Sequence, residues 1–227
     1  MVTEIKASVS STPAYPDSDG QLMADNTKQF RWIVAIKENL EWLFAENPNV
    51  FVAGDLLWYP VEGEPKIRMA PDVLVVFGRP KGDRGSYRQW QEENVVPQVV
   101  FEILSPGNRL KKMLEKLKFY DRFGVEEYYI YNPDNQELTG LVRSEAGLEL
   151  IDPANWTSPR LGIRFDLSGE ELQIYRPDGQ RFASYVEIAQ QAQQERQRAE
   201  KAESLLAQER QEKEQLIQRL RDLGQYP

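Results

Sequence analysis

The sequence predicts an α/β protein whose mixed sheet is flanked by helices, with added antiparallel strands and one long C-terminal helix. Two short apolar runs, residues 73–77 and 99–104, are typical of strands that are buried on both faces. Helical spacing of apolar residues precedes the first run and follows the second, and hairpin signals come later. Residues 186–223 contain neither glycine nor proline, which predicts the long helix.

The N-terminal part is expected to hold an arm, a helix and a strand. Residues 1–21 are rich in Ser, Thr, Pro and Asp, a composition that predicts a flexible arm. A helix capped by Asp25 or Asn26 is expected to run to about Glu46, because apolar residues recur in it at helical spacing. Residues 50–59 predict a strand before the first apolar run.

The part that follows the second apolar run predicts one helix and several strands. The helix is expected over residues 110–123, and a Pro-Asp-Asn turn separates the strands of a hairpin at 126–132 and 137–143. Later strands are expected around residues 148–151, 161–165 and 172–175. Tyr128, Tyr129 and Tyr131 are interpreted as sheet residues that fill the core and cover the edge.

The C-terminal segment, residues 186–227, is dense in Gln, Glu, Arg, Lys, Ala and Leu. A seam with alternating steps of three and four consists of Ala199, Ala202, Leu206, Leu216, Leu220 and Leu223. Glu209 and Lys213 interrupt this seam. A helix that is polar on most sides needs a partner, so the segment predicts a coiled coil and a homo-oligomer. The alternative is a solvated helix docked on its own domain.

Two acids stand on the strands that look most buried. Asp72 precedes the first apolar run and Glu102 interrupts the second. A carboxylate on such a strand is costly unless a cation compensates it, and neighbouring strands would bring both acids to one point. A divalent metal with oxygen ligands is the usual compensation. The alternative is that Asp72 caps a turn and that an arginine pairs with Glu102.

A basic helix follows the second acid. The breakers Pro106, Gly107 and Asn108 predict a turn, after which Arg109, Lys112, Lys116 and Tyr120 share one helical stripe. A lysine that reaches back over the acids could hold an attacking water and offset charge on a phosphate. The alternative is a solvated cationic face.

A longer string of residues resembles a known family. The string is Pro71-Asp72, Glu102-x-Leu104-Ser105-Pro106, Asn108, Lys116, Tyr120, Gly124-Val125 and Glu127-Tyr128. In order and spacing it is similar to the Uma-two family, a branch of the restriction-endonuclease-like PD-(D/E)XK nuclease superfamily, over residues 22–185. The resemblance implies a restriction-endonuclease-like fold and a metal-dependent endonuclease that hydrolyses nucleic acid, with DNA as the favoured substrate.

The resemblance also implies how such a site would work. Asp72 and Glu102, with a main-chain carbonyl near Ile103, would bind Mg²⁺ or Mn²⁺, which would lower the pKa of a bound water and polarise the phosphate. The superfamily's lysine usually stands two residues after the second acid. This chain has Leu104 there, so the lysine's role would pass to Lys116 on the following helix.

Other positions are candidates for supporting roles in this site. Ser105 and Tyr120 would lie directly behind the metal ligands and the lysine. Lys112 stands where relatives usually carry an acid, which adds positive charge to the stripe. Many superfamily members have a first-helix glutamate near the metal, so Glu41 is a candidate and Glu38 its rival. The alternative for both is a surface acid.

The segment between the two acid strands is polar. Within residues 78–96, basic side chains alternate with aromatic ones at Lys81, Arg84, Tyr87, Arg88 and Trp90, which suits contact with phosphates and bases. A solvated loop that packs one tryptophan fits equally well. Asp55 is another candidate for the site, although a loop or edge acid is the favoured interpretation.

Composition excludes several kinds of chemistry. The 227 residues include no Cys and no His, which excludes disulfides, thiolate or imidazole metal sites and serine–histidine triads. The formal net charge of −8 argues against avid nonspecific binding of nucleic acid. A membrane span needs about 18 to 20 continuous apolar residues. No such run and no signal pattern occur, so a cytoplasmic protein without membrane contact is expected.

These observations leave one main function and two alternatives. The main one is an Mg²⁺-dependent endodeoxyribonuclease. The first alternative is a catalytically silent binding or assembly protein that kept the nuclease fold and oligomerises through its C-terminal helix. The second alternative, a glycosidase with two carboxylates, fits poorly, because its acids would flank an open aromatic groove.

Overall fold

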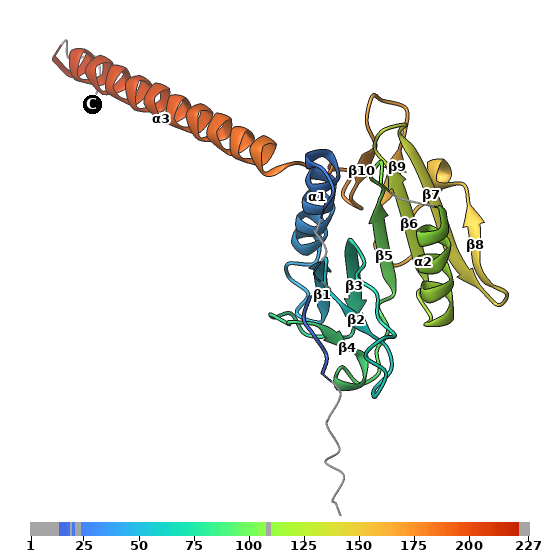
Figure 1. Ribbon diagram of the computed structural model, residues 1–227. Helices are drawn as coiled ribbons and strands as arrows, with labels where there is room; N and C mark the ends of the chain where they lie inside the picture. The colour runs from blue at the N-terminus through green and yellow to red at the C-terminus, as the bar shows by residue number, and fades with distance from the viewer. Residues whose placement is uncertain (1–13, 19, 21–23, 108–109, 223–227) are drawn as a thin grey trace, which may run out of the picture. The chain divides into compact units, whose positions relative to one another are not determined.

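The computed structural model describes residues 14–18, 20, 24–107 and 110–222 (Figure 1). The chain divides into two compact units, Met1–Phe182 and Ala183–Pro227. Asn108 and Arg109, expected in the turn and at the start of the basic stripe, lie outside the described residues, as does Leu223 of the expected seam.

A six-stranded mixed sheet forms the centre of the first unit, in the order β1-β3-β5-β6-β7-β8 (Figure 1). Its strands are β1 (Val50–Gly54), β3 (Val73–Phe77), β5 (Val99–Ile103), β6 (Glu127–Asn132), β7 (Glu137–Ser144) and β8 (Gly147–Ile151). Of the neighbouring pairs, β5 and β6 run parallel and the others antiparallel. Helix α2 (Leu110–Arg122) is the crossover that this parallel pair requires. The predicted α/β class with a mixed sheet is confirmed.

Both faces of the sheet are covered, which explains why its central strands are continuously apolar. On one face, helix α1 (Thr27–Leu43) and the pair β9 (Arg164–Asp166) and β10 (Gln173–Tyr175) pack against alternate residues such as Val75. On the other face, α2 packs with β2 (Trp58–Tyr59) and β4 (Tyr87–Arg88) against residues such as Leu74. Alternate residues of a strand point to opposite faces, so α1 and α2 lie on opposite sides of the sheet.

The expected strand over residues 50–59 is in fact two strands. β1 ends at Gly54, and Asp55 takes a left-handed conformation with φ of 49° that breaks the extended run. β2 then leaves the central sheet and pairs in parallel with β4, which lies in the segment expected to be a loop.

Of the two expected capping residues, Asn26 caps α1 by accepting a hydrogen bond from the backbone N–H of Gln29, and α1 ends at Leu43 rather than Glu46.

The described residues of the expected arm contact this smaller sheet. Tyr59 donates its hydroxyl to the carbonyl of Pro16 at 2.6 Å, and Arg88 donates to the carbonyl of Tyr15 at 3.1 Å. The ring of Tyr15 meets that of Trp90 with centroids 4.9 Å apart. Arg88 and Trp90, which were expected to suit contact with phosphates and bases, therefore contact the N-terminal arm of the same chain.

The second unit contains helix α3 (Tyr185–Asp222), and none of its 38 residues is buried. Its exposed apolar side chains include Leu205, Leu206 and Leu216. Within the part of the chain that the structure describes, no helix is long and apolar enough to cross a membrane.

Candidate functional site

The two acids Asp72 and Glu102 lie beside each other on the face of the sheet that α2 covers. The antiparallel register pairs Val73 of β3 with Phe101 of β5. Asp72 precedes Val73 and Glu102 follows Phe101, so the same register sets the two acids opposite each other. Neighbouring strands thus bring the acids to one point, as expected from the sequence.

Asp72 is held in a buried position by the backbone of the neighbouring strand. Its side chain accepts a hydrogen bond from the N–H of Ile103 at 2.6 Å, and the residue is 8% exposed. Burial and then the negative charge of Glu102 raise the pKa of Asp72 to about 8. Asp72 is therefore a carboxyl group for which the ionised form is costly, as expected of an acid that lacks a sufficient counter-charge.

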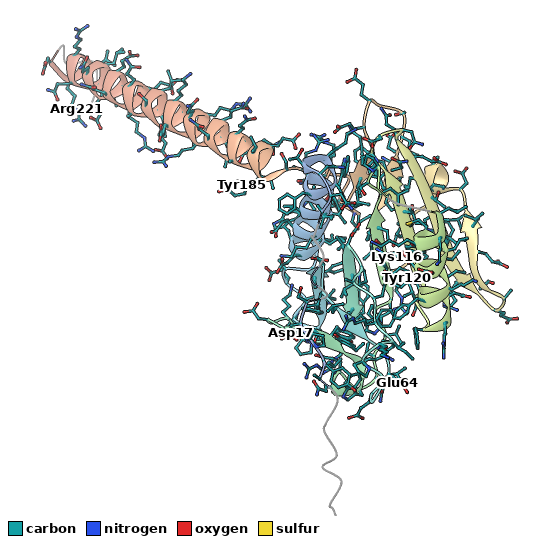
Figure 2. All side chains as sticks on the ribbon, in the orientation of Figure 1. Asp17, Glu64, Lys116, Tyr120, Tyr185 and Arg221 are labelled. Carbon is teal, nitrogen blue, oxygen red and sulfur yellow. The ribbon has the colours of Figure 1, made fainter. Side chains whose placement is uncertain are left out.

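Glu102 is the more deeply buried acid, at 2% exposure, and both of its oxygens are hydrogen-bonded to α2. Tyr120 donates its hydroxyl to Oε1 at 2.5 Å, and Lys116 donates to Oε2 in a buried salt bridge. Lys116 and Tyr120 are one helical turn apart and are the buried residues of α2 (Figure 2). Tyr120 packs in the apolar core of this face, so Lys116 is the buried side chain of α2 that apolar packing does not explain.

The acids set the protonation of Lys116 and Tyr120. Burial alone would lower the pKa of Lys116, but the charges of Glu102 and Asp72 outweigh burial and raise it. Burial and the charge of Glu102 raise the pKa of Tyr120 well above its usual value. At neutral pH Lys116 is therefore a cation and Tyr120 a neutral hydrogen-bond donor.

Both main-chain polar groups of Ile103 form hydrogen bonds at the site. Its N–H donates to Asp72, and its carbonyl accepts from α1. Gln29 donates its side-chain amide to this carbonyl at 2.7 Å and is 6% exposed. Gln29 was not predicted from the sequence, although a signal exists, because Gln29 precedes Ile33, Ile36 and Leu40 at helical spacing on the buried stripe. A polar residue within an apolar stripe needs a partner, and here the partner is the strand that carries Glu102.

Two of the expected supporting residues lie elsewhere. Ser105 donates its hydroxyl to the carboxylate of Asp25, so it joins the loop after β5 to the start of α1. Glu41 has a side chain that is 47% exposed and forms a salt bridge with Lys37, which also binds Glu38 at 2.9 Å. The residue that α1 brings to the acid strands is thus Gln29 and not a glutamate.

A third acid, Asp55, lies in the same cross-strand row. Its backbone N–H donates to the carbonyl of Asp72 at 3.1 Å, which continues the register that pairs Gly54 with Val73. The charge of Asp55 contributes to the raised pKa of both Asp72 and Lys116. The sequence favoured an edge acid here, because the pairing of β1 with β3 could not be known.

The basic residues between the acid strands are largely used inside the protein. Arg84 forms a salt bridge with Glu92 at 2.7 Å, and its guanidinium lies over the ring of Phe51 at 3.9 Å. Tyr87 is buried and donates its hydroxyl to the carbonyl of Val95. Arg84 and Tyr87 are therefore not available to phosphates or bases, and they do not lie in a solvated loop either, because Tyr87 is a buried residue of β4.

The donor set at the acids consists of oxygen atoms. Among the described residues, no three Asp, Glu, His or Cys side chains gather closely enough to share an ion. Asp72, Glu102 and the Ile103 carbonyl could together supply three oxygen ligands. Mg²⁺ and Mn²⁺ prefer oxygen ligands, and Mg²⁺ keeps several waters when it is bound by one or two carboxylates.

The chain matches a known protein family. The model of the Uma2 family, described as "Putative restriction endonuclease", matches residues 10–167, which is more than half of the chain. The chain belongs to the Uma2 family. The family model indicates a restriction-endonuclease-like nuclease, and the resemblance to the Uma-two family drawn from the sequence is confirmed.

A solved structure is among those that are similar to this Uma2 chain. It is the crystal structure of a "putative nuclease belonging to DUF820" from Anabaena variabilis ATCC 29413, with a TM-score of 0.45 and 15% sequence identity. The likeness covers 66% of this chain and 82% of that one. A search of curated proteins found no match.

Proposed function

We propose that this Uma2 chain is a metal-dependent endonuclease that hydrolyses phosphodiester bonds of nucleic acid, with DNA as its substrate. The observation that carries the proposal is the pair of buried acids, Asp72 and Glu102, under a lysine that α2 presents to them. The family description supports nucleic acid as the substrate, and DNA is the substrate class of a restriction endonuclease.

The residues present fit a divalent ion. Asp72 and Glu102 would bind Mg²⁺ or Mn²⁺ together with the carbonyl of Ile103, which has a second lone pair besides the one that accepts from Gln29. The raised pKa of Asp72 supports this assignment, because burial and Glu102 leave the ionised form short of positive charge. When bound, the ion supplies Lewis acidity and a water of lowered pKa.

Lys116 has a role that its protonation state defines. Because Glu102 and Asp72 raise its pKa against the effect of burial, Lys116 cannot serve as a general base at neutral pH. It can hold the attacking water by hydrogen bonding, and it can offset the negative charge that develops on the phosphate. Tyr120 fixes the orientation of Glu102 through its hydroxyl, and the ring of Trp58 stacks parallel to Tyr120 at 6.4 Å.

The long helix α3 supports a second part of the proposal, self-association as a coiled coil. All of its residues are exposed or half-buried, and Leu205, Leu206 and Leu216 are each more than half exposed. An isolated helix with an apolar seam is stabilised when the seam packs against another helix. A homo-oligomer would place two or more nuclease units on one nucleic acid.

A silent binding or assembly protein is the second candidate, and one observation favours it. Both oxygens of Glu102 already have donors within the protein, and Lys116 neutralises its charge. An acid satisfied in this way does not need a metal. If this candidate is correct, Glu102 and Lys116 form a structural salt bridge.

Calorimetric titration with Mn²⁺, run beside a plasmid-nicking assay, separates the two candidates. The wild type should bind Mn²⁺ and nick the plasmid, whereas Asp72→Asn and Glu102→Gln should bind Mn²⁺ more weakly and lose nicking. Glu149→Gln, an exposed acid on β8, is the matched control and should behave as the wild type. Unchanged Mn²⁺ affinity in both site variants would overturn the metal assignment, and Mn²⁺ binding without nicking would favour the silent protein.

A further inference from the structure

Tyr128 of β6 has a buried hydroxyl that forms no hydrogen bond with any residue that the structure describes. The residue is 0% exposed. Its neighbours on the strand differ: the hydroxyl of Tyr129 bonds to Glu127 and Trp156, and that of Tyr131 accepts from the N–H of Leu172. All three tyrosines are buried in the core, as expected, but they do not cover an edge of the sheet, because β6 lies between β5 and β7.

The position of Tyr128 places it with the site. The parallel register pairs Tyr128 with Val100, one step before Glu102 on the same face of the sheet. The rings of Tyr128 and Tyr120 are 4.9 Å apart, and Tyr120 donates to Glu102. After burial, the charges of Glu102 and Asp72 are the causes that raise the pKa of Tyr128, so both acids act on its hydroxyl.

A buried hydroxyl without a partner destabilises the folded state relative to a satisfied one, and a phenylalanine would avoid this cost. Among the described residues, two other buried side-chain nitrogens form no hydrogen bond. Trp32 Nε1 belongs to α1 on the opposite face, and Arg176 Nε forms an ion pair with Asp178 at 3.5 Å. Of the three atoms, the Tyr128 hydroxyl is the one on the face of the sheet that carries the acids.

We propose that the hydroxyl of Tyr128 donates a hydrogen bond to a non-bridging oxygen of the phosphate group that the site takes as substrate. This inference rests on the proposed nuclease function and adds a substrate-binding residue to it. The phosphate carries negative charge into a site with two acids, so each donor around it contributes. Tyr128 would do so beside Lys116, as a neutral donor that keeps its proton.

The test compares Tyr128→Phe with Tyr129→Phe, two neighbouring substitutions that each remove one buried hydroxyl. Four measurements are made on the full chain: thermal unfolding without metal, Mn²⁺ binding, binding of inorganic phosphate to the Mn²⁺-loaded protein, and plasmid nicking. Tyr128→Phe should unfold at the same or a higher temperature, because no bond is lost. Tyr129→Phe should unfold about 2–4 °C lower, because Glu127 and Trp156 each lose a partner.

In the binding experiments, Tyr128→Phe should keep the Mn²⁺ affinity of the wild type. Its phosphate affinity and its nicking rate should each fall about tenfold or more, as for a lost hydrogen bond to a charged group. Tyr129→Phe should retain both. A Tyr128→Phe protein as destabilised as Tyr129→Phe would overturn the proposal, because the hydroxyl would then have a structural partner such as a water.

If Tyr128→Phe binds phosphate as tightly as the wild type does, this inference is overturned, while the proposed nuclease function remains. A wild type that binds neither Mn²⁺ nor phosphate would overturn the nuclease function and this inference together. The two failures are therefore distinguishable in the wild-type titrations alone.

Discussion

Two buried glutamates on neighbouring strands, Glu102 of β5 and Glu127 of β6, use opposite means to remain in the protein interior. Glu127 is 1% exposed and accepts hydrogen bonds from neutral donors only: the hydroxyls of Tyr129 and Ser158 and the N–H of Arg160. Glu102 is 2% exposed, lies opposite a second acid and is paired with a cation, Lys116.

The difference separates structure from chemistry. The hydroxyl of Ser158 and the N–H of Arg160 come from a distant loop and fix that loop to the strand, and with Tyr129 they satisfy both oxygens of Glu127. An acid that lies opposite another acid and is paired with a lysine is the arrangement proposed above to bind a metal. Burial of an acid alone would not have distinguished these two glutamates.

The largest effect that would sharpen the comparison is expected at Lys116. Lys116→Ala should lower the nicking rate by about 10²–10³-fold, the range for loss of one charge-stabilising donor, while Mn²⁺ binding remains. Lys111→Ala is the control, because Lys111 is on the same helix with a side chain that is 88% exposed. Equal losses in both variants would mean that general positive charge on α2, rather than one placed lysine, is what matters.

The next effect concerns Glu127. Glu127→Gln should lower the free energy of unfolding by about 2 kcal/mol, because an amide N–H₂ would then face donors in place of an acceptor oxygen. Urea unfolding measures this loss, and Mn²⁺ affinity of the folded protein should not change. A loss of Mn²⁺ binding in this variant would contradict the structural role.

Replacing an acid by its amide at Asp72 should change the free energy of unfolding in the opposite direction. Asp72→Asn should leave the metal-free protein as stable as the wild type or more stable by about 1 kcal/mol, because a neutral amide avoids the cost of a buried charge and the repulsion from Glu102. Urea unfolding without metal is the measurement. If Asp72→Asn and Glu127→Gln destabilise the protein alike, both acids are structural and the comparison fails.

The dependence on pH should show the same contrast. Burial and Glu102 raise the pKa of Asp72 from 3.8 to about 8, so its protonated form is favoured in the folded state. This contribution to stability is fully present below pH 3.8 and is lost as the pH rises toward 8. Metal-free wild type should therefore lose stability between pH 5 and pH 8 relative to Asp72→Asn, as unfolding curves at several pH values would reveal.

The smallest effect on the site is expected from the tail. Ending the chain after Phe182, where the first unit ends, should leave Mn²⁺ affinity unchanged and reduce the number of chains per particle. Light scattering measures the particle mass. The same number of chains in both forms would show that α3 does not set the assembly.

The sequence was sufficient for those parts of the molecule that local patterns determine. The apolar runs identified β3 and β5, and helical spacing put Lys116 and Tyr120 on one stripe of α2. Contacts between residues far apart in the sequence could not be predicted from it. Ser105 faces Asp25 and Gln29 faces the Ile103 carbonyl, over separations of 80 and 74 residues.

Short elements were the other source of error. β2 and β4 have two residues each, too few to show any periodicity, and their pairing depends on the break at Asp55. Glu127 was hidden for a related reason, because Ser158 and Arg160, which satisfy it, come more than 30 residues later. An acid at the start of a strand is ordinarily a surface residue.

The crossover from β5 through α2 has a consequence for how the chain folds. Glu102 lies only 14 residues from Lys116 and 18 from Tyr120, whereas Asp72 meets Ile103 across 31 residues. Shorter loops close at a lower entropic cost, so we expect the lysine and the glutamate to meet before Asp72 joins them. The segment from β5 to α2 thus supplies both Glu102 and its counter-ion Lys116. A partly folded chain therefore does not have to bury Glu102 without its counter-ion.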